Sequence, residues 1–524
     1  MAWNLNHFKK TLLILFLLGP SLLMAGTTQN SEDFVLKIKN NFHMKDFKSS
    51  LENKLHVKLM DQHEEARLFL IKKPKDMTLS TLTTKLAAIS GFEYLVPNVK
   101  FRMVSSLSDP LYSQQWAMEK IATEKAWDLE TNKEPIVVAV IDTGVDYRHQ
   151  DLKDQMLRDS SGELVGWNFF DNNKDPIDVT SSANPGHGTH CSGIIAAVAN
   201  NSMGVAGVAQ NVRLMPLRFI GADGSGDLMN AIKAIDFAIS HHADIISASW
   251  GATVPRDQVK PLLEAIERAK EKGIFFVAAA ANDGASNDKT EVYPANAGFD
   301  NMISVAASDK DDKKPSWSNF GRYTVDLSSP GADILSTLPS DKYGKLSGTS
   351  MATPLVAGLA ALLLGQARSQ GKNYSASEIK AIMQSSGSLV DIETACGCRI
   401  AADGAMSSLV GNKLVLVPNA FSIEPGDQKA FHAIGGHGSF RFSSSDDKIA
   451  SVTADGALKA IADGEVTVKV VDGDGHEALS RSIHVGKKPA SGGGGGGTME
   501  CPLPNPQLCD LMCVIMPSLP WCKK

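Results

Sequence analysis

The sequence is poor in the features that mark nucleic-acid-binding and membrane-spanning proteins. Aromatic residues make up only 6% of the 524 residues, and no basic patch interleaved with aromatics occurs, so nothing indicates binding to nucleic acid. Two apolar runs, one within residues 7–26 and one at 355–365, are both too short to span a bilayer comfortably. We interpret the second run as a buried helix. The composition, 43% hydrophobic and 21% charged, is that of a soluble globular protein with a large core.

Residues 1–25 have the build of a secretory signal peptide. Lys9 and Lys10 precede the first apolar run, and small residues follow it near Ala25. An uncleaved membrane anchor is the alternative for this run. The signal predicts export, so that the protein is secreted or held in the cell envelope, where disulfides persist.

Cysteine is scarce, and its count of seven is odd, so at least one thiol is free or bonded to another molecule. Four cysteines crowd into the last two dozen residues, at Cys501, Cys509, Cys513 and Cys522. Cys396 and Cys398 are separated by one residue. That spacing is too close for an easy mutual bridge, which leaves pairing with the tail open to them.

Hydrophobic patterning divides the rest of the chain into parts of different architecture. Residues 26–105 alternate strand-like and helix-like pieces, which predicts a small α+β module. In 106–410, short apolar runs alternate with helical segments, so we expect an α/β fold, a mostly parallel sheet with helices on both faces. Residues 411–487 show short alternating strands between Gly and Asp turns, which predicts a β-sandwich. A Gly-rich linker at 488–500 leads to a Cys-rich tail, 501–524, that needs disulfides to hold any shape.

Charge is unevenly spread along the chain. Residues 26–105 hold 13 Lys and Arg against 9 Asp and Glu, a net charge of +4. Because the whole chain carries −6 and Lys9 and Lys10 add +2, residues 106–524 carry −12. Opposite charges suit two parts of a chain that bind each other.

Three motifs carry the residues of a nucleophilic mechanism. VVAVIDTGVD ends an apolar strand at Asp142, GHGTHCSG offers His187 at the start of a helix, and LSGTSMATP offers Ser350 at the start of another. A serine hydroxyl is a poor nucleophile unless a neighbouring imidazole takes its proton. A buried carboxylate then fixes the imidazole tautomer and stabilises its cation. In parallel α/β sheets such sites lie beyond the carboxyl ends of the strands.

In their order Asp, His, Ser, these motifs resemble those of the subtilisin-family serine proteases. HGTHCSG and DPLYSQQW are similar to the thermitase and proteinase K branches, and the resemblance covers about residues 109–409. It implies a serine endopeptidase that hydrolyses polypeptides through an acyl-enzyme on Ser350. It also implies that Asn282, in FFVAAAANDG, forms the oxyanion hole together with the backbone N–H of Ser350.

The GHGTHCSG segment has other interpretations. His187, His190 and Cys191 could bind zinc, or Cys191 could be the nucleophile of a cysteine protease. No other ligand cluster supports zinc. Cys191 lies four residues after His187 on the same helical face, where it packs beside the imidazole. The resemblance therefore makes His187 the base, His190 structural and Cys191 a free thiol sensitive to mercurials.

The resemblance also implies the walls of a substrate cleft. In the family, the backbone of the SWG segment pairs with an extended substrate chain, and the AAAAN segment lines the primary specificity pocket. The substrate-binding residues are then Ser249, Trp250, Gly251, Ala280, Ala281 and Val292. Val292 narrows the pocket floor, which indicates a shallow apolar pocket. Ala281 departs from the family, where glycine usually precedes the asparagine.

Calcium is the cofactor that the resemblance implies. Asp109, Asp151 and Asn201 match the family's strong calcium site. There, two carboxylates, an amide oxygen and loop carbonyls supply the hard oxygen ligands that calcium prefers.

The flanking parts resemble known accessory domains. Residues 26–105 are similar to the family's inhibitory prosegment, whose C-terminal end lies in the substrate cleft until the protease cuts it, here between about residues 104 and 109. Residues 411–487 are similar to bacterial Ig-like domains of group two. Surface binding, spacing of the tail and stabilisation of the enzyme are all open for that domain.

Together these features predict an exported, monomeric, calcium-dependent serine endopeptidase, made as a self-processing prepro-enzyme with its own prosegment as inhibitor. The alternative from another class is a surface-binding or adhesion protein whose protease domain mainly performs maturation, with binding through the C-terminal modules. A catalytically silent scaffold is disfavoured because Asp142, His187, Ser350 and Asn282 are all present.

Overall fold

The computed structural model describes residues 33–489, except 56, 75–76 and 100–106. Several interpretations of the sequence fall outside the described residues: the signal peptide (1–25), most of the linker (490–500), the tail (501–524) and positions 104–106 of the expected cleavage segment. Two compact units make up the chain, Met1–Ser105 and Ser106–Lys524.

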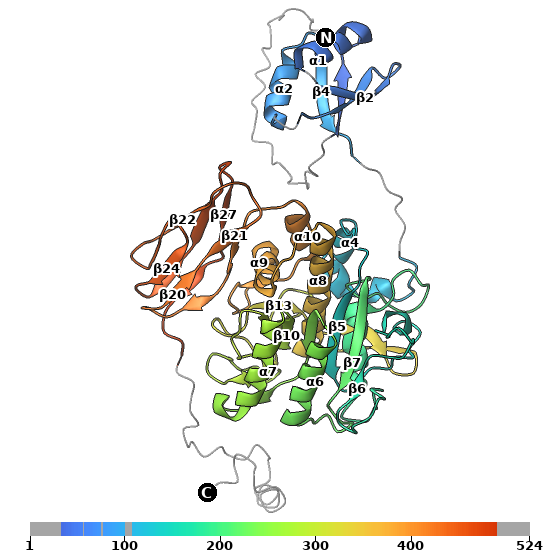
Figure 1. The fold of residues 1–524 in the computed structure, drawn as a ribbon, viewed down its shortest axis with the longest axis vertical. Coiled ribbons are helices and arrows are strands. Elements are labelled where there is room, and N and C mark those ends of the chain that lie inside the picture. The colour runs from blue at the N-terminus through green and yellow to red at the C-terminus, as the bar shows by residue number, and fades with distance from the viewer. Residues whose placement is uncertain (1–32, 56, 75–76, 100–106, 490–524) are drawn as a thin grey trace, which may run out of the picture. The chain divides into compact units, whose positions relative to one another are not determined.

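The first unit is built on four antiparallel strands in the order β2-β3-β1-β4. Figure 1 labels its helices α1 and α2 and its strands β2 and β4. Its elements are β1 (Asp33–Ile38), α1 (Met44–Leu55), β2 (Lys58–His63), β3 (Leu68–Lys72), α2 (Leu79–Ala87) and β4 (Phe92–Pro97). Alternate residues of β1 are buried because successive side chains of a strand point to opposite faces. They pack with Leu82 and Leu86 of α2 into a hydrophobic core of their own. The described part of this unit is thus an α+β module.

The second unit contains a nine-stranded sheet in the order β16-β17-β13-β12-β10-β8-β5-β7-β6. Every neighbouring pair is parallel except β16–β17 at one edge. The strands are β5 (Ile136–Asp142), β6 (Trp167–Asn168), β7 (Val212–Arg218), β8 (Ile245–Ala248), β10 (Phe275–Ala279), β12 (Met302–Ser308), β13 (Leu327–Pro330), β16 (Ser388–Leu389) and β17 (Cys398–Arg399). The central strands are buried along almost their whole length, as apolar strands covered on both faces must be.

Helices cover both faces of this sheet, which confirms the predicted α/β class. The helices of the second unit are α3 (Trp116–Lys120), α4 (Thr123–Trp127), α5 (His187–Ala196), α6 (Leu228–Ser240), α7 (Lys260–Glu271), α8 (Thr349–Ser369), α9 (Ala376–Ser386) and α10 (Ala402–Val410). Along β5, Val138 and Val140 join the core beneath α5 and α8, whereas Ala139 and Ile141 join the core beneath α6 and α7.

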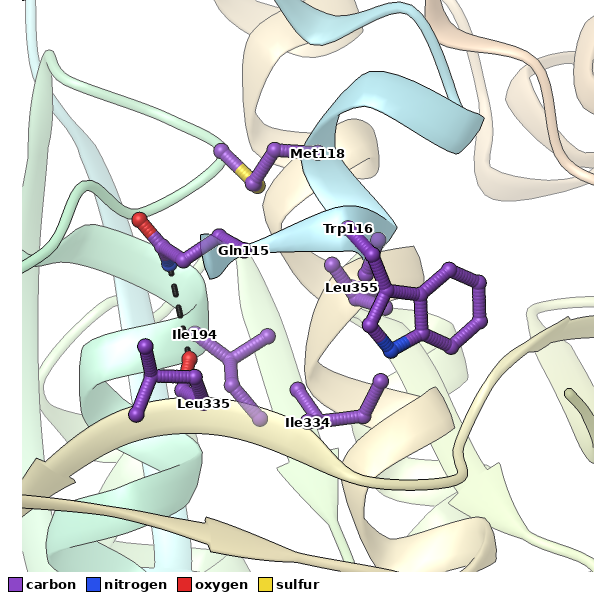
Figure 2. Close-up of a pocket in the computed structure, with 8 residues that line it drawn as sticks. Gln115, Trp116, Met118, Ile194, Ile334, Leu335 and Leu355 are labelled. Carbon is purple, nitrogen blue, oxygen red and sulfur yellow. Dashed lines mark hydrogen bonds between the residues drawn. The ribbon is translucent and has the colours of Figure 1, made fainter. Parts of the chain in front are cut away.

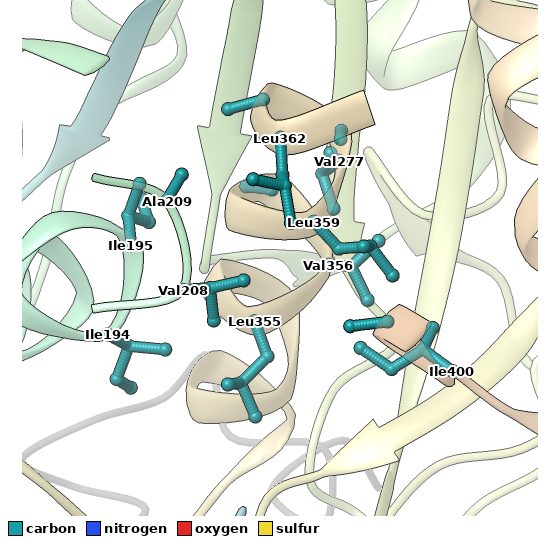
Figure 3. Packing of buried hydrophobic residues seen from close by; sticks show 14 of the residues in the cluster. Ile194, Ile195, Val208, Ala209, Val277, Leu355, Val356, Leu359, Leu362 and Ile400 are labelled. Atoms are coloured by element: carbon teal, nitrogen blue, oxygen red, sulfur yellow. The ribbon is translucent and has the colours of Figure 1, made fainter. Parts of the chain in front are cut away.

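Helix α8 is the apolar run that the sequence suggested as a buried helix. Its composition would suit a membrane span, but 94% of its most apolar window is buried inside the protein. Figure 3 shows Leu355, Val356, Leu359 and Leu362 packed between α5, the sheet and Ile400. The prediction of a core helix is confirmed.

The remaining strands form small sheets. Two antiparallel pairs join β9 (Ala252–Thr253) to β11 (Val292–Tyr293) and, as a hairpin, β14 (Ile334–Leu338) to β15 (Lys342–Leu346). The C-terminal β-sandwich consists of β18 (Val415–Val417), β19 (Ser422–Ile423), β20 (Gln428–Ala430), β21 (His432–Ile434), β22 (Arg441–Ser444), β23 (Ala450–Val452), β24 (Ala457–Ala460), β25 (Gly464–Val466), β26 (Val468–Val471), β27 (Glu477–Leu479) and β28 (Ile483–Val485). Its inner faces share one hydrophobic core.

The β-sandwich is fixed to the C-terminal end of α9 through Arg481. The guanidinium donates to the backbone carbonyls of Gln384 (2.9 Å), Ser385 (3.1 Å) and Gly387 (2.5 Å). These carbonyls belong to the end of a helix, where the helix itself offers no N–H partner. The sandwich therefore completes the hydrogen bonding of a helix in the neighbouring α/β region.

The structure corrects our expectation for Cys396 and Cys398, which form a disulfide with each other. The single residue between them is Gly397, whose φ of +54° turns the chain back on itself. The two Cα atoms come within 5.1 Å, inside the usual range for a disulfide. The spacing alone suggested no bridge, because sequence spacing does not report the left-handed conformation that glycine adopts readily. Cys191 is the free cysteine among the described residues.

Candidate active site

Two of the predicted catalytic residues are joined by a hydrogen bond at the carboxyl end of β5. Asp142 is the last residue of β5 and is 1% exposed, and His187 is the first residue of α5. His187 Nδ1 lies 2.7 Å from Asp142 Oδ1. A buried acceptor at Nδ1 fixes the tautomer that leaves Nε2 free to take a proton.

Electrostatics around the imidazole favour its charged form. Burial opposes protonation of His187, but the charge and hydrogen bond of Asp142, together with the charge of Asp178, outweigh it and raise the pKa of His187. The imidazole side chain keeps 25% of its surface exposed. A buried carboxylate behind a partly open imidazole is the arrangement that general-base catalysis requires.

Ser350 lies in the first turn of α8 and is hydrogen-bonded to Ser249, the residue that follows β8. Its hydroxyl donates to the backbone carbonyl of Ser249 at 3.0 Å. Its own carbonyl oxygen accepts from the Ser249 hydroxyl at 3.0 Å and from the Cys191 thiol at 3.3 Å. Cys191 Sγ also lies within 4.8 Å of ligand atoms of Asp142 and His187. The structure thus gathers Asp142, His187 and Ser350 around one cysteine.

The predicted oxyanion-hole residue lies beside the start of α8. Asn282 Oδ1 accepts from the backbone N–H of Thr349 at 2.8 Å and from its hydroxyl at 3.0 Å. Both bonds use the amide oxygen, so Nδ2 remains available as a donor next to the N-terminal end of α8. The partial positive charge of a helix N-terminus favours an anion there.

The two alanines before Asn282 differ in backbone conformation. Ala280 is fully buried, with 0% of its surface exposed. Ala281 has φ of +90°, in the region that residues with a Cβ rarely adopt. The family's usual glycine adopts this conformation without strain. The substitution noted in the sequence therefore falls where glycine has a conformational advantage.

Of the remaining predicted substrate-binding residues, Val292 lies in a short antiparallel ladder, and Ser249, Trp250 and Gly251 directly precede its other strand, β9. Val292, in β11, pairs with Thr253 of β9 and is 1% exposed. A Cβ added to Gly251 would lie 3.0 Å from Val292 Cγ1, so the two residues are in close contact. Trp250 is held by a bond from its Nε1 to the carbonyl of Ile141, 2.8 Å away at the end of β5.

A cleft opens beside Trp250 and Gly251, two of the predicted substrate-binding residues. Its volume is about 290 Å³, and its walls are mostly apolar. The lining includes Phe219, Ile220, Leu228, Trp250, Leu262 and Tyr293. Its other lining residues come from segments far apart in the sequence, among them Gly224 and Gly226 of the Gly-rich loop at 221–226, and were not predicted.

A second cavity, shown in Figure 2, is too small to bind a ligand. It holds about 10 Å³ between Trp116, Ile194, Ile334 and Leu355. That is no more than the space of one water molecule. We regard it as a packing gap behind α8.

The three predicted calcium ligands lie together. Asn201 donates from its backbone N–H to Asp109 Oδ1 (3.1 Å) and from Nδ2 to Asp151 Oδ1 (2.7 Å). Asp109 is 4% exposed and Asp151 0% exposed, and burial raises the pKa of Asp151. Among the described residues neither carboxylate forms an ion pair with a lysine or arginine. Two buried carboxylates without a basic partner fit a divalent cation with oxygen ligands. The Asn201 amide oxygen accepts from the backbone N–H of Met203 at 2.8 Å.

The zinc and cysteine-nucleophile interpretations of GHGTHCSG gain no support. His190 Nε2 is bonded to the carbonyl of Gly344 (3.0 Å), and His190 is not part of the cluster formed by Asp142, His187 and Cys191. Burial lowers the pKa of His190 to about 4 and raises the pKa of Cys191 well above its ordinary value. A buried thiol with a raised pKa is a poor nucleophile.

The fold and the site define an α/β serine hydrolase: a hydrogen-bonded Asp–His pair and a serine meet at the carboxyl ends of a parallel sheet. Residues 133–412 match the subtilase family, and residues 416–482 match the bacterial Ig-like domain (group 2). The chain belongs to the subtilase family, and its matched region is a subtilisin-like serine endopeptidase domain.

Several characterised proteins are similar to this chain. Thermophilic serine proteinase of Bacillus sp. (strain AK1) is 40% identical over 53% of this chain and 64% of its own length. Thermitase of Thermoactinomyces vulgaris is 40% identical over 50% of this chain and 86% of its own length. The halolysin-like extracellular serine protease Nep of Natrialba magadii is 35% identical over 52% of this chain and 48% of its own length. The chain thus spans less than two thirds of two of these three relatives.

One solved structure gives the same assignment. A protease from Pseudoalteromonas arctica PAMC 21717 is 29% identical, with a TM-score of 0.50. The match covers 58% of this chain and 100% of that one.

Proposed function

We propose that this chain is an exported, calcium-dependent serine endopeptidase that forms an acyl-enzyme on Ser350 and removes its own N-terminal unit. The observation that carries the proposal is the 2.7 Å hydrogen bond between His187 Nδ1 and Asp142 Oδ1, with Ser350 at the neighbouring helix end.

In the proposed reaction, the Ser350 hydroxyl turns from the Ser249 carbonyl toward His187 Nε2. It loses its proton to that nitrogen as Oγ attacks the substrate carbonyl carbon. The imidazolium is stabilised by Asp142 and then donates the proton to the departing amine as the C–N bond breaks. Water, deprotonated by the same imidazole, then attacks the ester carbonyl carbon. As the ester C–O bond breaks and the carboxyl product leaves, the imidazolium returns the proton to Ser350 Oγ.

The oxyanion of both tetrahedral intermediates is assigned to Asn282 Nδ2 and the backbone N–H of Ser350. The support is the position of Asn282, whose Oδ1 is held by Thr349 so that the amide N–H remains available. One such donor is typically worth about 3–4 kcal/mol of barrier.

For the substrate, we propose an extended polypeptide that pairs with the backbone of residues 249–251. The apolar cleft of about 290 Å³ beside Trp250 suits an apolar side chain of that polypeptide. Val292 against Gly251 leaves little depth beside them, which supports a preference for small or medium apolar residues at the primary pocket.

Calcium is proposed to bind at Asp109, Asp151 and Asn201. When bound, it would supply positive charge that compensates two buried carboxylates, and it would tie the segment at residue 109 to the loop after α5. The ion's role is thus assigned to stability, because none of its three ligands is part of the reacting group.

Self-processing is supported by the independent core of the first unit and by the net charge of +4 on residues 26–105 against −12 on residues 106–524. Export is supported by the extracellular relative Nep and by the expected signal peptide. Of the roles open to the Ig-like region, its fixed contact with α9 supports stabilisation of the enzyme.

The test is the N-terminal sequence of the purified wild-type protein beside Ser350→Ala, both prepared with calcium. We expect wild type to begin between residues 104 and 109 and the variant to keep the first unit. Identical processing of both proteins would assign the cut to another protease. Ser350→Ala must also abolish hydrolysis of peptide substrates; full activity in that variant would refute the proposed nucleophile.

A further inference from the structure

A second buried carboxylate lies behind the Asp–His pair. Asp178, in the loop between β6 and α5, is 5% exposed and accepts four hydrogen bonds. Its Oδ1 accepts from Thr143 Oγ1 (2.9 Å) and Asn184 Nδ2 (2.8 Å). Its Oδ2 accepts from Thr189 Oγ1 (2.7 Å) and Thr189 N (3.0 Å). Among the described residues no lysine or arginine forms an ion pair with it.

Asp178 organises the first turn of α5, which carries His187. The N-cap residue, Gly186, has no side chain to bond the free N–H groups of this helix end. Side chains from outside the helix do so instead. The bonds run from His187 N to Asn184 Oδ1 (2.9 Å), from Gly188 N to Thr143 Oγ1 (2.9 Å) and from Thr189 N to Asp178 Oδ2 (3.0 Å). Asp178 makes one of these bonds and holds the side chains that make the other two.

Asp178 is also connected to Asp142, the other member of the Asp–His pair. Thr143, which donates to Asp178, also donates its backbone N–H to Asp142 Oδ1 at 2.7 Å. That oxygen is the one bonded to His187 Nδ1. Asp178 is therefore linked to the imidazole through the helix end and to the carboxylate through Thr143.

Few charges face His187. The groups around it are Asp142, Asp178, His190 and Cys191. Burial lowers the pKa of His190 to about 4 and raises that of Cys191, so both are neutral near pH 7. The four donors that surround Asp178 favour its ionised form although burial raises its pKa. The two carboxylates are thus the charges that act on the imidazole.

We propose that Asp178 is a positioning residue, which holds the His187 imidazole against Asp142 and adds a second negative charge that stabilises the imidazolium. It contacts neither substrate nor reacting atoms and acts through Thr143, Asn184 and the first turn of α5. This proposal rests on the proposed peptidase function.

The test compares Asp178→Asn with the matched control Asp175→Asn. Asp175 is on the same loop but exposed, with its Oδ1 bonded to the Tyr147 hydroxyl (3.0 Å). The variants are assayed on a peptide substrate for kcat, KM and the pH dependence of kcat/KM. In a Ser350→Ala background, the ring protons of His187 are titrated by NMR.

For Asp178→Asn we expect kcat to fall at least about ten-fold with KM within about two-fold, because misaligned general bases lose chemistry rather than binding. The acid limb of the profile and the NMR titration of His187 should both move to lower pH, because a negative charge is lost. Asp175→Asn should change none of these. A folded Asp178→Asn enzyme with wild-type kcat and an unmoved acid limb overturns the proposal.

If Asp178→Asn does not fold, Thr143→Val tests the link alone, since it keeps the charge but removes the bridging hydroxyl. We then expect a lower kcat with the acid limb unmoved, and a wild-type kcat overturns the proposal. A wild-type protein without peptidase activity would refute the proposed function instead, which keeps the two failures distinguishable.

Discussion

The thiol of Cys191 donates to the carbonyl oxygen of Ser350 at 3.3 Å, and the same oxygen accepts from the Ser249 hydroxyl at 3.0 Å. Cys191 is fully buried, and burial raises its pKa well above the ordinary value. A thiol in this state packs beneath the proposed nucleophile and has little reactivity toward a substrate carbonyl. Its Sγ nevertheless lies within 4.8 Å of ligand atoms of Asp142 and His187, so we expect mercury bound to this sulfur to disturb the Asp–His pair.

Replacing Cys191 should therefore separate packing from chemistry. We expect Cys191→Ala to keep kcat within about ten-fold of wild type, because the nucleophile and base remain. It should also lose inhibition by mercuric chloride, measured as residual peptidase activity. Loss of activity as complete as in Ser350→Ala would make the cysteine part of the chemistry. Inhibition that persists in Cys191→Ala would place the sensitive group elsewhere.

The backbone of Ala281 should store strain that glycine relieves. At φ of +90° an alanine costs about 1–3 kcal/mol, while glycine adds up to about 1 kcal/mol of unfolded-state entropy. We expect Ala281→Gly to raise the melting temperature by roughly 2 °C in the Ser350→Ala background. The matched control is Ala280→Gly, which removes a buried methyl group and should lower it. Equal losses in both variants would show that Ala281 is unstrained.

Local patterns in the sequence were sufficient to predict helices and strands, but they did not predict contacts between distant segments. The apolar run in α8 and the buried strand ending at Asp142 follow from periodicity, because burial repeats along one element. Asp178 gave no such signal, since its partners come from the loop after β5 and from both sides of the α5 N-terminus. Apart from Trp250 and Gly251, the lining of the cleft was missed for the same reason.

The disulfide shows a second kind of limit. The spacing of Cys396 and Cys398 argued against a bridge because only one residue separates them. The φ of +54° at Gly397 reverses that geometry, and it is a property of one backbone angle that spacing does not report. Asp142 and His187, by contrast, lie within hydrogen-bond distance of each other, and their catalytic roles stay predictions. Geometry that depends on one strand end and one helix end can be anticipated from motifs.

Removal of calcium should destabilise the protein through Asp151. A ligand that binds only the folded state at 100 times its Kd adds about 2.7 kcal/mol of stability. We expect EDTA to lower the melting temperature of Ser350→Ala by several degrees, and Asp151→Asn to lower it and to remove most of the response. The control Asp154→Asn changes an exposed carboxylate three residues away and should respond like the parent. A parent protein indifferent to EDTA would contradict the proposed site.

Stability toward acid should depend on His190. Burial lowers its pKa to about 4 in the folded protein, whereas an unfolded histidine titrates at about 6.5. Below pH 6.5 the unfolded chain binds the proton first, so the free energy of unfolding falls as pH drops from about 6.5 toward 4.

Urea unfolding of Ser350→Ala at several pH values measures this effect. His190→Gln keeps a donor for the Gly344 carbonyl but cannot titrate. The free energy of unfolding should therefore fall less steeply with pH over that interval, by a slope equivalent to at most one bound proton. His241→Gln, an exposed histidine at the end of α6, is the control and should keep the parent slope. Parallel slopes in all three proteins would assign the acid sensitivity to other groups.

Arg481 should make the Ig-like region part of the enzyme's stability. Its guanidinium bonds three carbonyls at the end of α9, and Tyr323 reinforces the contact with a bond to the Gly486 carbonyl at 2.8 Å. Arg481→Ala leaves the carbonyls without these partners, so we expect a loss of about 2–3 kcal/mol. Arg441→Ala, on an exposed position of β22 in the same region, should cost much less stability.

The melting temperature of the α/β region, followed in the Ser350→Ala background, decides between two roles for the Ig-like region. A lower value in Arg481→Ala alone means that the sandwich stabilises the peptidase domain, whereas unchanged values in both variants would mean that it melts as an independent module, free to serve surface binding.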